Sequence, residues 1–382
     1  MRKGRIVAFW SIIVLMVFAV GESVSYFVLK IIEQNRPGIV LDLFINNHFS
    51  SLEIQDTRKY KAGLYDPDLG WDYEPESSYE QVNRAGQPYR MSWGEDGARS
   101  DGISDVEPYI ATYGDSFIAG EEVNDQETWQ YYLSEAIGKR VLNFGTSGYG
   151  TDQSLMKFRK HVEESQILPV TVLGIFEENI KRNLNEFRPF YRPADGIVLG
   201  FKPRFSCEPH LDLKPNPLAE FEEDAAALRE IAESTARTDA YAQAKIRFRF
   251  PYSFRVGQIL LEFVRVRSGM SSWLVPASLD LWQDPEALRL MDCIIEEFLE
   301  ICRRNDSVPV ILFIPKAPSR ESRAPYADFA EQLAKRHSDA VVIDAGALEF
   351  DSERFLVTPT GGHVSPYGNR IIADALRDSL GL

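Results

Sequence analysis

Residues able to attack and activate an ester occur in four loops of this sequence, each after a short apolar run. The first loop contains Gly114-Asp115-Ser116, and the last contains His363. A serine at a strand tip can be exposed with its own N–H aimed into the same pocket, which suits a nucleophile that also binds an oxyanion. The glycines around Gly148 let the backbone approach a ligand, and the amide of Asn179 can donate a hydrogen bond. These residue types predict nucleophilic acyl chemistry.

Short apolar runs alternate with segments of helical spacing from residue 108 onward. The expected strands are 109–113, 141–144, 170–176, 308–314 and 340–344, and the expected helices are 127–137, 151–164, 285–302, 324–336 and 366–380. This alternation is typical of a parallel sheet covered on both faces. Loops at the carboxyl ends of parallel strands open onto one crevice, so the four loops should meet there. We therefore predict an α/β fold with about five parallel strands.

The order of these loops resembles the SGNH (GDSL-type) hydrolase superfamily. Its four blocks match Gly114-Asp115-Ser116, Gly148, Asn179 and His363 in sequence order. The resemblance implies a three-layer α/β/α, flavodoxin-like fold and ester hydrolysis or acyl transfer. It also implies that Ser116 is the nucleophile and His363 the general base. The Ser116 N–H, the Gly148 N–H and the Asn179 side chain would form the oxyanion hole.

The third block departs from the family pattern, which usually reads Asn-Asp. Here Glu178-Asn179 stands in its place. The asparagine then occupies the position of the family's aspartate, and Asn183 is the alternative donor.

The last block departs from the usual Asp-x-x-His because Thr360 replaces the aspartate. The imidazole must then be oriented by a backbone carbonyl or by another acid. Asp351 is the nearest upstream acid, and Asp344 ends the last expected strand, so both are candidates. The alternative is that both aspartates cap local turns or are solvated.

Other chemistries find less support. Glu121 and Glu122 are adjacent acids, but neighbouring side chains point apart, which favours a solvated surface over a glycosidase pair. Ile118 prevents a G-x-S-x-G elbow around Ser116. Gln153 stands where a dinucleotide-binding loop has glycine. No histidine lies near another at a ligand spacing, so we expect no metal and no cofactor.

The composition is that of a folded, acidic protein. Hydrophobic residues make up 44% and charged residues 26% of the 382 residues, which excludes a disordered chain or a multi-span membrane protein. The formal net charge of −15 argues against a nucleic-acid partner, because phosphate binding needs cations. Cys293 and Cys302 share one expected helix and lie about 13 Å apart, too far for a disulfide. We expect no disulfide scaffold.

An uncharged apolar run, Ile6–Gly21, follows three basic residues at the N-terminus. Continued past Glu22 to Leu29, it forms a helix long enough to span a membrane, with the carboxylate near the far interface. A cleaved signal peptide is the alternative, because Ala19 and Gly21 form a small-x-small cleavage pattern. The basic flank should keep the N-terminus in the cytoplasm and place the rest of the chain outside.

These observations divide the chain into three parts. We expect a transmembrane anchor at 1–32, an irregular extension with short strands at 33–105, and an SGNH-like domain at 106–382 with an insertion at about 185–283. The phrases GEEVNDQETW and NFGTSGYGTDQ, with the anchor, are similar to membrane-anchored family members found near bacterial envelope-polysaccharide genes.

Three functions follow from this resemblance. The first is a serine esterase or acyltransferase acting on O-acyl groups, in particular O-acetyl groups, of an exported glycan. Its partners would be the acylated glycan or a small ester, the membrane, and envelope glycan-assembly proteins. The second is a catalytically inactive glycan-binding or assembly protein that keeps the fold, which the missing aspartate and the altered third block would suit. The third is a secreted lipase or esterase.

Overall fold

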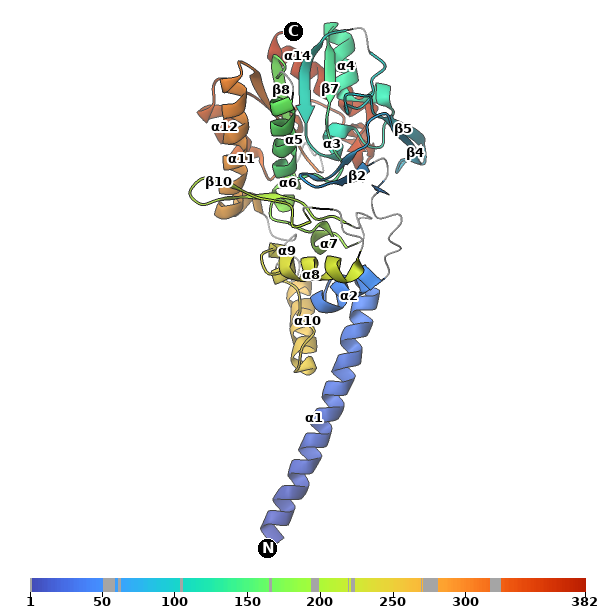
Figure 1. The fold of residues 1–382 in the computed structure, drawn as a ribbon, viewed down its shortest axis with the longest axis vertical. Coiled ribbons are helices and arrows are strands. Elements are labelled where there is room, and N and C mark those ends of the chain that lie inside the picture. Colours follow the sequence, from blue (N-terminus) through green and yellow to red (C-terminus); the bar gives the residue numbers. More distant parts are fainter. Residues whose placement is uncertain are drawn as a thin grey trace. The chain divides into compact units, whose positions relative to one another are not determined.

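The computed structural model of the chain describes residues 2–50, 59–60, 63–103, 106–164, 167–193, 199–218, 220, 224–268, 270, 281–316 and 324–382 (Figure 1). The chain forms two compact units. The first comprises Met1–Thr57, Asn185–Gly200 and Glu220–Leu279, and the second comprises Arg58–Leu184, Phe201–Ala219 and Asp280–Leu382. The expected insertion at 185–283 is therefore divided between the two units.

A five-stranded parallel sheet forms the centre of the second unit. Its strands are β6 (Pro108–Tyr113), β7 (Arg140–Asn143), β8 (Val170–Phe176), β11 (Val308–Ile314) and β12 (Val341–Asp344). They are arranged in the order β12-β11-β8-β6-β7, and each pair is parallel. Numbered along the chain this is 5-4-3-1-2, the flavodoxin-like order read from its other edge. The predicted fold class is confirmed.

Helices cover both faces of this sheet. In β11, Ile311 and Phe313 face one hydrophobic core, while Leu312 and its alternate neighbours face the other, as the twofold period of a strand requires. The first core is covered by α5 (Thr151–Glu164), α11 (Pro285–Arg304) and α12 (Ala327–Arg336). The second is covered by α4 (Trp129–Ile137) and α14 (Pro366–Leu380). The result is the predicted three-layer α/β/α arrangement.

The remaining strands of the second unit are short and antiparallel. They are β1 (Lys59–Tyr60), β2 (Gly63–Asp66), β3 (Gly70–Tyr73), β4 (Ser78–Val82), β5 (Pro88–Ser92), β9 (Arg204–Cys207), β10 (Leu211–Lys214), β13 (Leu356–Thr358) and β14 (Gly361–Val364). The expectation of short strands within 33–105 agrees with β1–β5. The helix α2 (Leu41–Ser50) in the same stretch was not predicted.

The first unit is helical in its described residues. Its helices are α1 (Arg2–Asn35), α2, α7 (Arg188–Tyr191), α8 (Ala225–Thr235), α9 (Ala240–Gln243) and α10 (Tyr252–Arg267). Within α1, the stretch Arg5–Asn35 is long and apolar enough to cross a membrane. The predicted N-terminal helix is therefore present, and its apolar side chains are largely exposed.

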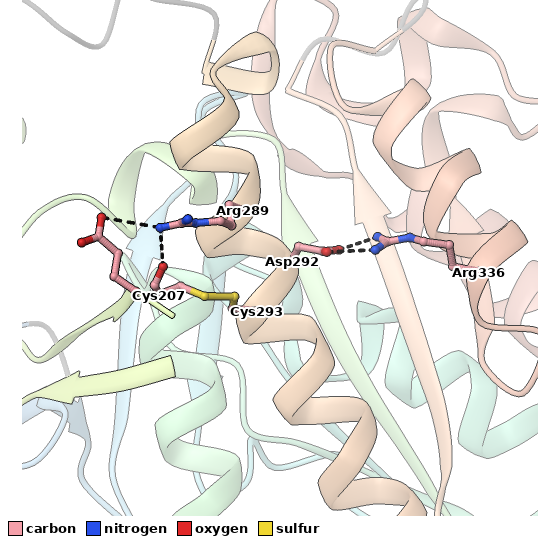
Figure 2. The surroundings of a disulfide bond; sticks show 6 residues. Cys207, Arg289, Asp292, Cys293 and Arg336 are labelled. Carbon is pink, nitrogen blue, oxygen red and sulfur yellow. Dashed lines mark hydrogen bonds and ion pairs between the residues drawn. A yellow bond between two sulfur atoms is a disulfide. The ribbon is translucent and has the colours of Figure 1, made fainter. Parts of the chain in front are cut away.

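A disulfide bond joins Cys207 on β9 to Cys293 on α11, contrary to the expectation from the sequence (Figure 2). Arg289, one turn earlier on α11, donates a hydrogen bond to the carbonyl of Cys207 at 2.5 Å. Cys302 is free and buried. Cys293 and Cys302 are not bonded to each other, as their spacing along one helix predicts. Spacing does not reveal that the β9–β10 hairpin packs on α11, because Cys207 and Cys293 are 86 residues apart.

Candidate active site

The nucleophile candidate lies at the carboxyl end of β6, which pairs with β8 and β7 in the parallel sheet. Ser116 opens the short helix α3 (Ser116–Ala119), and Asp115 caps it by accepting a hydrogen bond from the Phe117 N–H at 2.9 Å. His363 lies on β14, and its Nε2 atom is 2.9 Å from Ser116 Oγ. The structure therefore brings together two residues that are 247 positions apart in sequence. The distance is right for proton transfer from the hydroxyl to the imidazole.

Glu122 supplies the carboxylate that the last sequence block lacks. Its Oε2 atom lies 2.8 Å from His363 Nδ1 and also accepts the backbone N–H of His363 at 2.8 Å. Its Oε1 atom accepts the backbone N–H of Arg84 at 2.9 Å. With Nδ1–H directed at Glu122, Nε2 is left as the acceptor that faces Ser116. Ser116, His363 and Glu122 thus have the geometry of a serine–histidine–acid triad.

The two aspartates proposed from the sequence serve other groups. Asp351 caps α13 (Ser352–Phe355) and accepts a hydrogen bond from the Glu353 N–H at 3.1 Å. Asp344 caps the turn Ala345–Ala347 and accepts a hydrogen bond from the Tyr326 hydroxyl at 2.8 Å. The prediction that one of them, or a backbone carbonyl, orients His363 is therefore wrong. The alternative weighed beside it, that both cap local turns, describes their positions.

The prediction that the adjacent acids Glu121 and Glu122 form a solvated surface is also wrong. Glu121 and Glu122 are only 7% and 8% exposed. Glu122 has φ of +69°, a left-handed conformation, two residues after Gly120, the C-cap of α3. Both carboxylates contact the His363 ring. Glu121 Oε2 lies 3.4 Å from Nε2, while Glu122 contacts Nδ1.

Hydrogen bonding to His363 sets the ionisation of Glu122. Burial raises the pKa of this carboxyl, but the hydrogen bond and charge of His363, together with the backbone N–H groups of His363 and Arg84, lower it to about 2. Glu122 is therefore ionised throughout the neutral and mildly acidic range. It can stabilise an imidazolium there without taking its proton.

This lowered pKa predicts a specific loss of stability in acid. The folded protein gains stability from ionised Glu122 above the ordinary pKa of 4.5, and the gain disappears as pH falls towards 2. The full difference corresponds to roughly 3 kcal/mol, which partial solvation reduces to on the order of 2 kcal/mol. Urea unfolding of the detergent-solubilised chain should show the stability gap between wild type and Glu122→Gln closing between pH 6 and pH 2. A gap that does not change with pH would contradict the assignment.

The third sequence block holds the nucleophile loop in place. The amide of Asn179 donates to Asp115 Oδ2 at 3.2 Å and to the Tyr149 carbonyl at 3.1 Å, and its oxygen accepts the Phe176 N–H at 2.7 Å. Both amide hydrogens are thus directed at protein oxygens. The structure does not place this side chain as a donor toward Ser116, in contrast to the predicted oxyanion role.

The fallback residue Asn183 is engaged in a similar way. Its oxygen accepts the Asp152 N–H at 3.3 Å, and its amide nitrogen lies 3.8 Å from the sulfur of Met291. Neither asparagine of this segment therefore points at the serine.

A buried ion pair between Arg182 and Asp115 holds the loop that carries Ser116. Arg182, at the end of α6 (Asn179–Arg182), donates to Asp115 Oδ2 at 2.7 Å and to the Tyr149 carbonyl at 2.8 Å. Asp115 is fully buried, and its other oxygen caps α3. Arg182 lies outside the four sequence blocks and was not predicted. Removing one partner of such a pair leaves a buried charge unpaired, so this pair fixes the position of the loop that carries Ser116.

The loop that contains Gly148 lies against α3, the helix that begins with Ser116. Thr146 donates its N–H to the Gly114 carbonyl at 3.0 Å, and a Cβ on Gly145 would come within 2.3 Å of the Ala119 nitrogen. Gly148 has φ of +82°, which favours glycine. The close approach of this loop to α3 is therefore built into its glycines. The Ser116 N–H belongs to the first turn of α3, where N–H groups have no partner within the helix.

Glu121 belongs to a chain of hydrogen-bonded side chains that also includes Ser147 and Tyr73. Its carboxylate accepts a hydrogen bond from the Ser147 hydroxyl, which also contacts the Tyr73 hydroxyl. The Tyr73 ring stacks on Trp93 with the ring centroids 3.9 Å apart. The described residues contain no group of three or more His, Cys, Asp or Glu side chains placed to hold a metal ion.

No family model and no curated protein matches the chain, but solved structures do. A lipolytic protein of the G-D-S-L family from Desulfitobacterium hafniense DCB-2 is 11% identical, with a TM-score of 0.37, over 72% of this chain and 99% of that one. The acetyl xylan esterase Est2A from Butyrivibrio proteoclasticus is 10% identical, with a TM-score of 0.32, over 73% and 66%. The salicylyl-acyltransferase SsfX3 is 12% identical, with a TM-score of 0.33, over 73% and 55%. These likenesses are distant and concern the fold alone.

Proposed function

We propose that the protein is a serine esterase or acyltransferase of the SGNH type. The observation that carries the proposal is the line of hydrogen bonds from Ser116 through His363 to Glu122, with distances of 2.9 and 2.8 Å. The flavodoxin-like sheet order and the four sequence blocks support the same class. Two reasons favoured an inactive glycan-binding protein: the missing aspartate and the altered third block. The Glu122 carboxylate, 2.8 Å from His363 Nδ1, argues against the first reason.

The mechanism follows from which atoms are donors and acceptors. Nε2 of His363 accepts the hydroxyl proton as Ser116 Oγ attacks the acyl carbonyl. The resulting imidazolium is stabilised by ionised Glu122 on its other side. The N–H groups of Ser116 and Gly148 are the proposed donors to the oxyanion. His363 then returns the proton to the departing alcohol oxygen, which leaves an acyl ester on Ser116.

The second half of the reaction decides between hydrolysis and transfer. Water or a sugar hydroxyl gives its proton to His363 and attacks the acyl-enzyme. His363 then passes this proton to Ser116 Oγ as the bond between the acyl group and the serine breaks, which restores the free enzyme. We propose that the acyl group is acetyl and that the donor or acceptor is an exported glycan, in keeping with the membrane-anchored relatives that the sequence resembles. A secreted lipase is the remaining alternative of the esterase class.

An assay on an acetylated glycan tests this substrate. The purified full chain should release acetate from an O-acetylated polysaccharide, or move a labelled acetyl group onto a deacetylated one, and Ser116→Ala should do neither. Turnover of long-chain p-nitrophenyl esters without any reaction on the glycan would favour the lipase. Turnover of neither substrate by the wild type would favour the binding protein.

We also propose that the catalytic unit lies outside the cytoplasm. The apolar stretch Arg5–Asn35 follows a basic start, which orients an anchor with its N-terminus inside. The bond between Cys207 and Cys293 supports export, since disulfides persist mainly in oxidising compartments.

A reporter fusion tests this topology. Alkaline phosphatase fused to the C-terminus should be active, and a cytoplasm-dependent fluorescent protein at the same site should be dark. The opposite pair of results would refute the proposal. Recovery of a soluble mature chain that starts near Glu22 would show instead that the segment is a cleaved signal.

A further inference from the structure

Helix α10 presents its side chains in the reverse of the usual order. Four large apolar residues, Leu260, Leu261, Phe263 and Val264, are 60 to 65% exposed. Ser253 and Arg267, near the two ends of the helix, are exposed, but four other polar or charged residues lie on the opposite side, which is half-buried or buried: Arg255, Gln258, Glu262 and Arg265. These four positions recur at three- and four-residue intervals and therefore share one face of a helix.

This inside-out arrangement indicates an apolar surrounding. A helix on a protein in water turns its apolar stripe to the core and its charges to the solvent. Contiguous exposed apolar side chains mark a binding or membrane surface. In α10 the side chain of Glu262 is only 6% exposed, while Leu261 beside it is 65% exposed. The outer face of α10 is therefore built to contact something other than water.

The position of α10 next to α1 identifies that surrounding. Both helices belong to the first unit and pack against each other (Figure 1). The Glu22 carboxylate of α1 accepts the Tyr252 N–H at 2.5 Å and the Ser253 N–H at 3.3 Å, so it satisfies the first N–H groups of α10. The rings of Phe18 and Phe250 make an edge contact at 5.9 Å. The single acid within the apolar run thus has a structural partner.

α1 also exposes apolar side chains beyond the Glu22 contact with α10. They include Val24, Phe27 and Ile31, which are 57 to 62% exposed. We propose that α10 is a second membrane-embedded element and that bilayer lipid covers its outer face. Its 16 residues span about 24 Å, less than the roughly 30 Å hydrocarbon core, so it accompanies part of α1 and does not cross the membrane alone. The proposal rests on α1 as the anchor.

Lipid-dependent quenching tests the proposal on the full chain. Leu261→Cys and Phe263→Cys are each labelled with an environment-sensitive fluorophore. The native cysteines should not react with the fluorophore, because Cys207 and Cys293 are bonded to each other and Cys302 is buried. Val14→Cys, on α1, reports the anchor. Val82→Cys, 66% exposed on β4, is the matched apolar control on the catalytic unit. In nanodiscs with nitroxide-labelled phospholipid, the two α10 labels and the Val14 label should be strongly quenched, and the Val82 label should not.

Aqueous iodide should give the opposite pattern, with quenching at position 82 alone. Iodide quenching at positions 261 and 263 without lipid quenching would overturn the proposal while leaving the anchor intact. Loss of lipid quenching at position 14 as well would refute the anchor, and with it the membrane contact of α10. If a photo-crosslinker at position 261 captures another membrane protein in native membranes and lipid quenching is absent, the face belongs to a protein partner and the lipid proposal is wrong. None of these readouts depends on esterase activity.

Discussion

Replacing Glu122 with glutamine should reduce kcat on a small acetyl ester about ten-thousandfold, or roughly 5 kcal/mol of barrier. The carboxylate accepts a hydrogen bond from the Nδ1–H group of His363 at 2.8 Å. This contact leaves Nε2 without a proton, so that it can accept the proton of Ser116. A glutamine at this position can donate its amide hydrogen to Nδ1, which favours the tautomer with the proton on Nε2. That tautomer cannot accept the proton of the serine. The Glu122→Gln variant also lacks the negative charge that stabilises the imidazolium.

Two controls distinguish this effect from a general loss of structure. Asp351→Asn and Asp344→Asn change the acids that cap local turns, and each should cost less than about a hundredfold in rate. All three variants should keep the far-UV circular dichroism of the wild type. A ten-thousandfold loss in either aspartate variant, with Glu122→Gln nearly unaffected, would show that another acid orients His363 in solution.

Ser116→Ala should reduce turnover of p-nitrophenyl acetate to the background rate and abolish labelling by a fluorophosphonate probe. The substitution removes the attacking oxygen at the start of α3 and leaves Asp115 to cap the helix through its contact with the Phe117 N–H. It deletes a single oxygen from a side chain outside the hydrophobic core, so the unfolding transition should remain close to that of the wild type. His363→Ala should lose nearly as much activity, because a triad acts as a unit.

The outcome that would contradict the serine assignment is retention of wild-type rate by Ser116→Ala. A folded wild-type protein that is inactive on every acyl donor and is not labelled by the probe would return the protein to the binding class. Labelling of wild type without turnover would place the defect in the second half-reaction, where an acceptor other than water is required.

The layered fold could be predicted because its causes are local. Apolar runs such as 170–176 and 308–314 are buried throughout or nearly so in the structure, and amphipathic segments between them form the covering helices. Parallel strands place all their carboxyl ends at one edge of the sheet. The serine and the histidine could therefore be paired from their positions after the strands, although 247 residues separate them.

Contacts made by loops and across the fold were decided only by the tertiary structure. The Glu122 carboxylate contacts the histidine, and Glu122 itself has a left-handed backbone conformation shortly after α3. No spacing rule in the sequence predicts this conformation or this contact. Asn179 faces Asp115 because Arg182 and the Tyr149 carbonyl complete a buried polar cluster there. Cys207 meets Cys293 because a hairpin packs on a helix 86 residues away in sequence. Secondary structure and strand-end positions follow from the periodicity of side chains along the chain. The partner of each polar group depends on which surfaces meet when the chain folds.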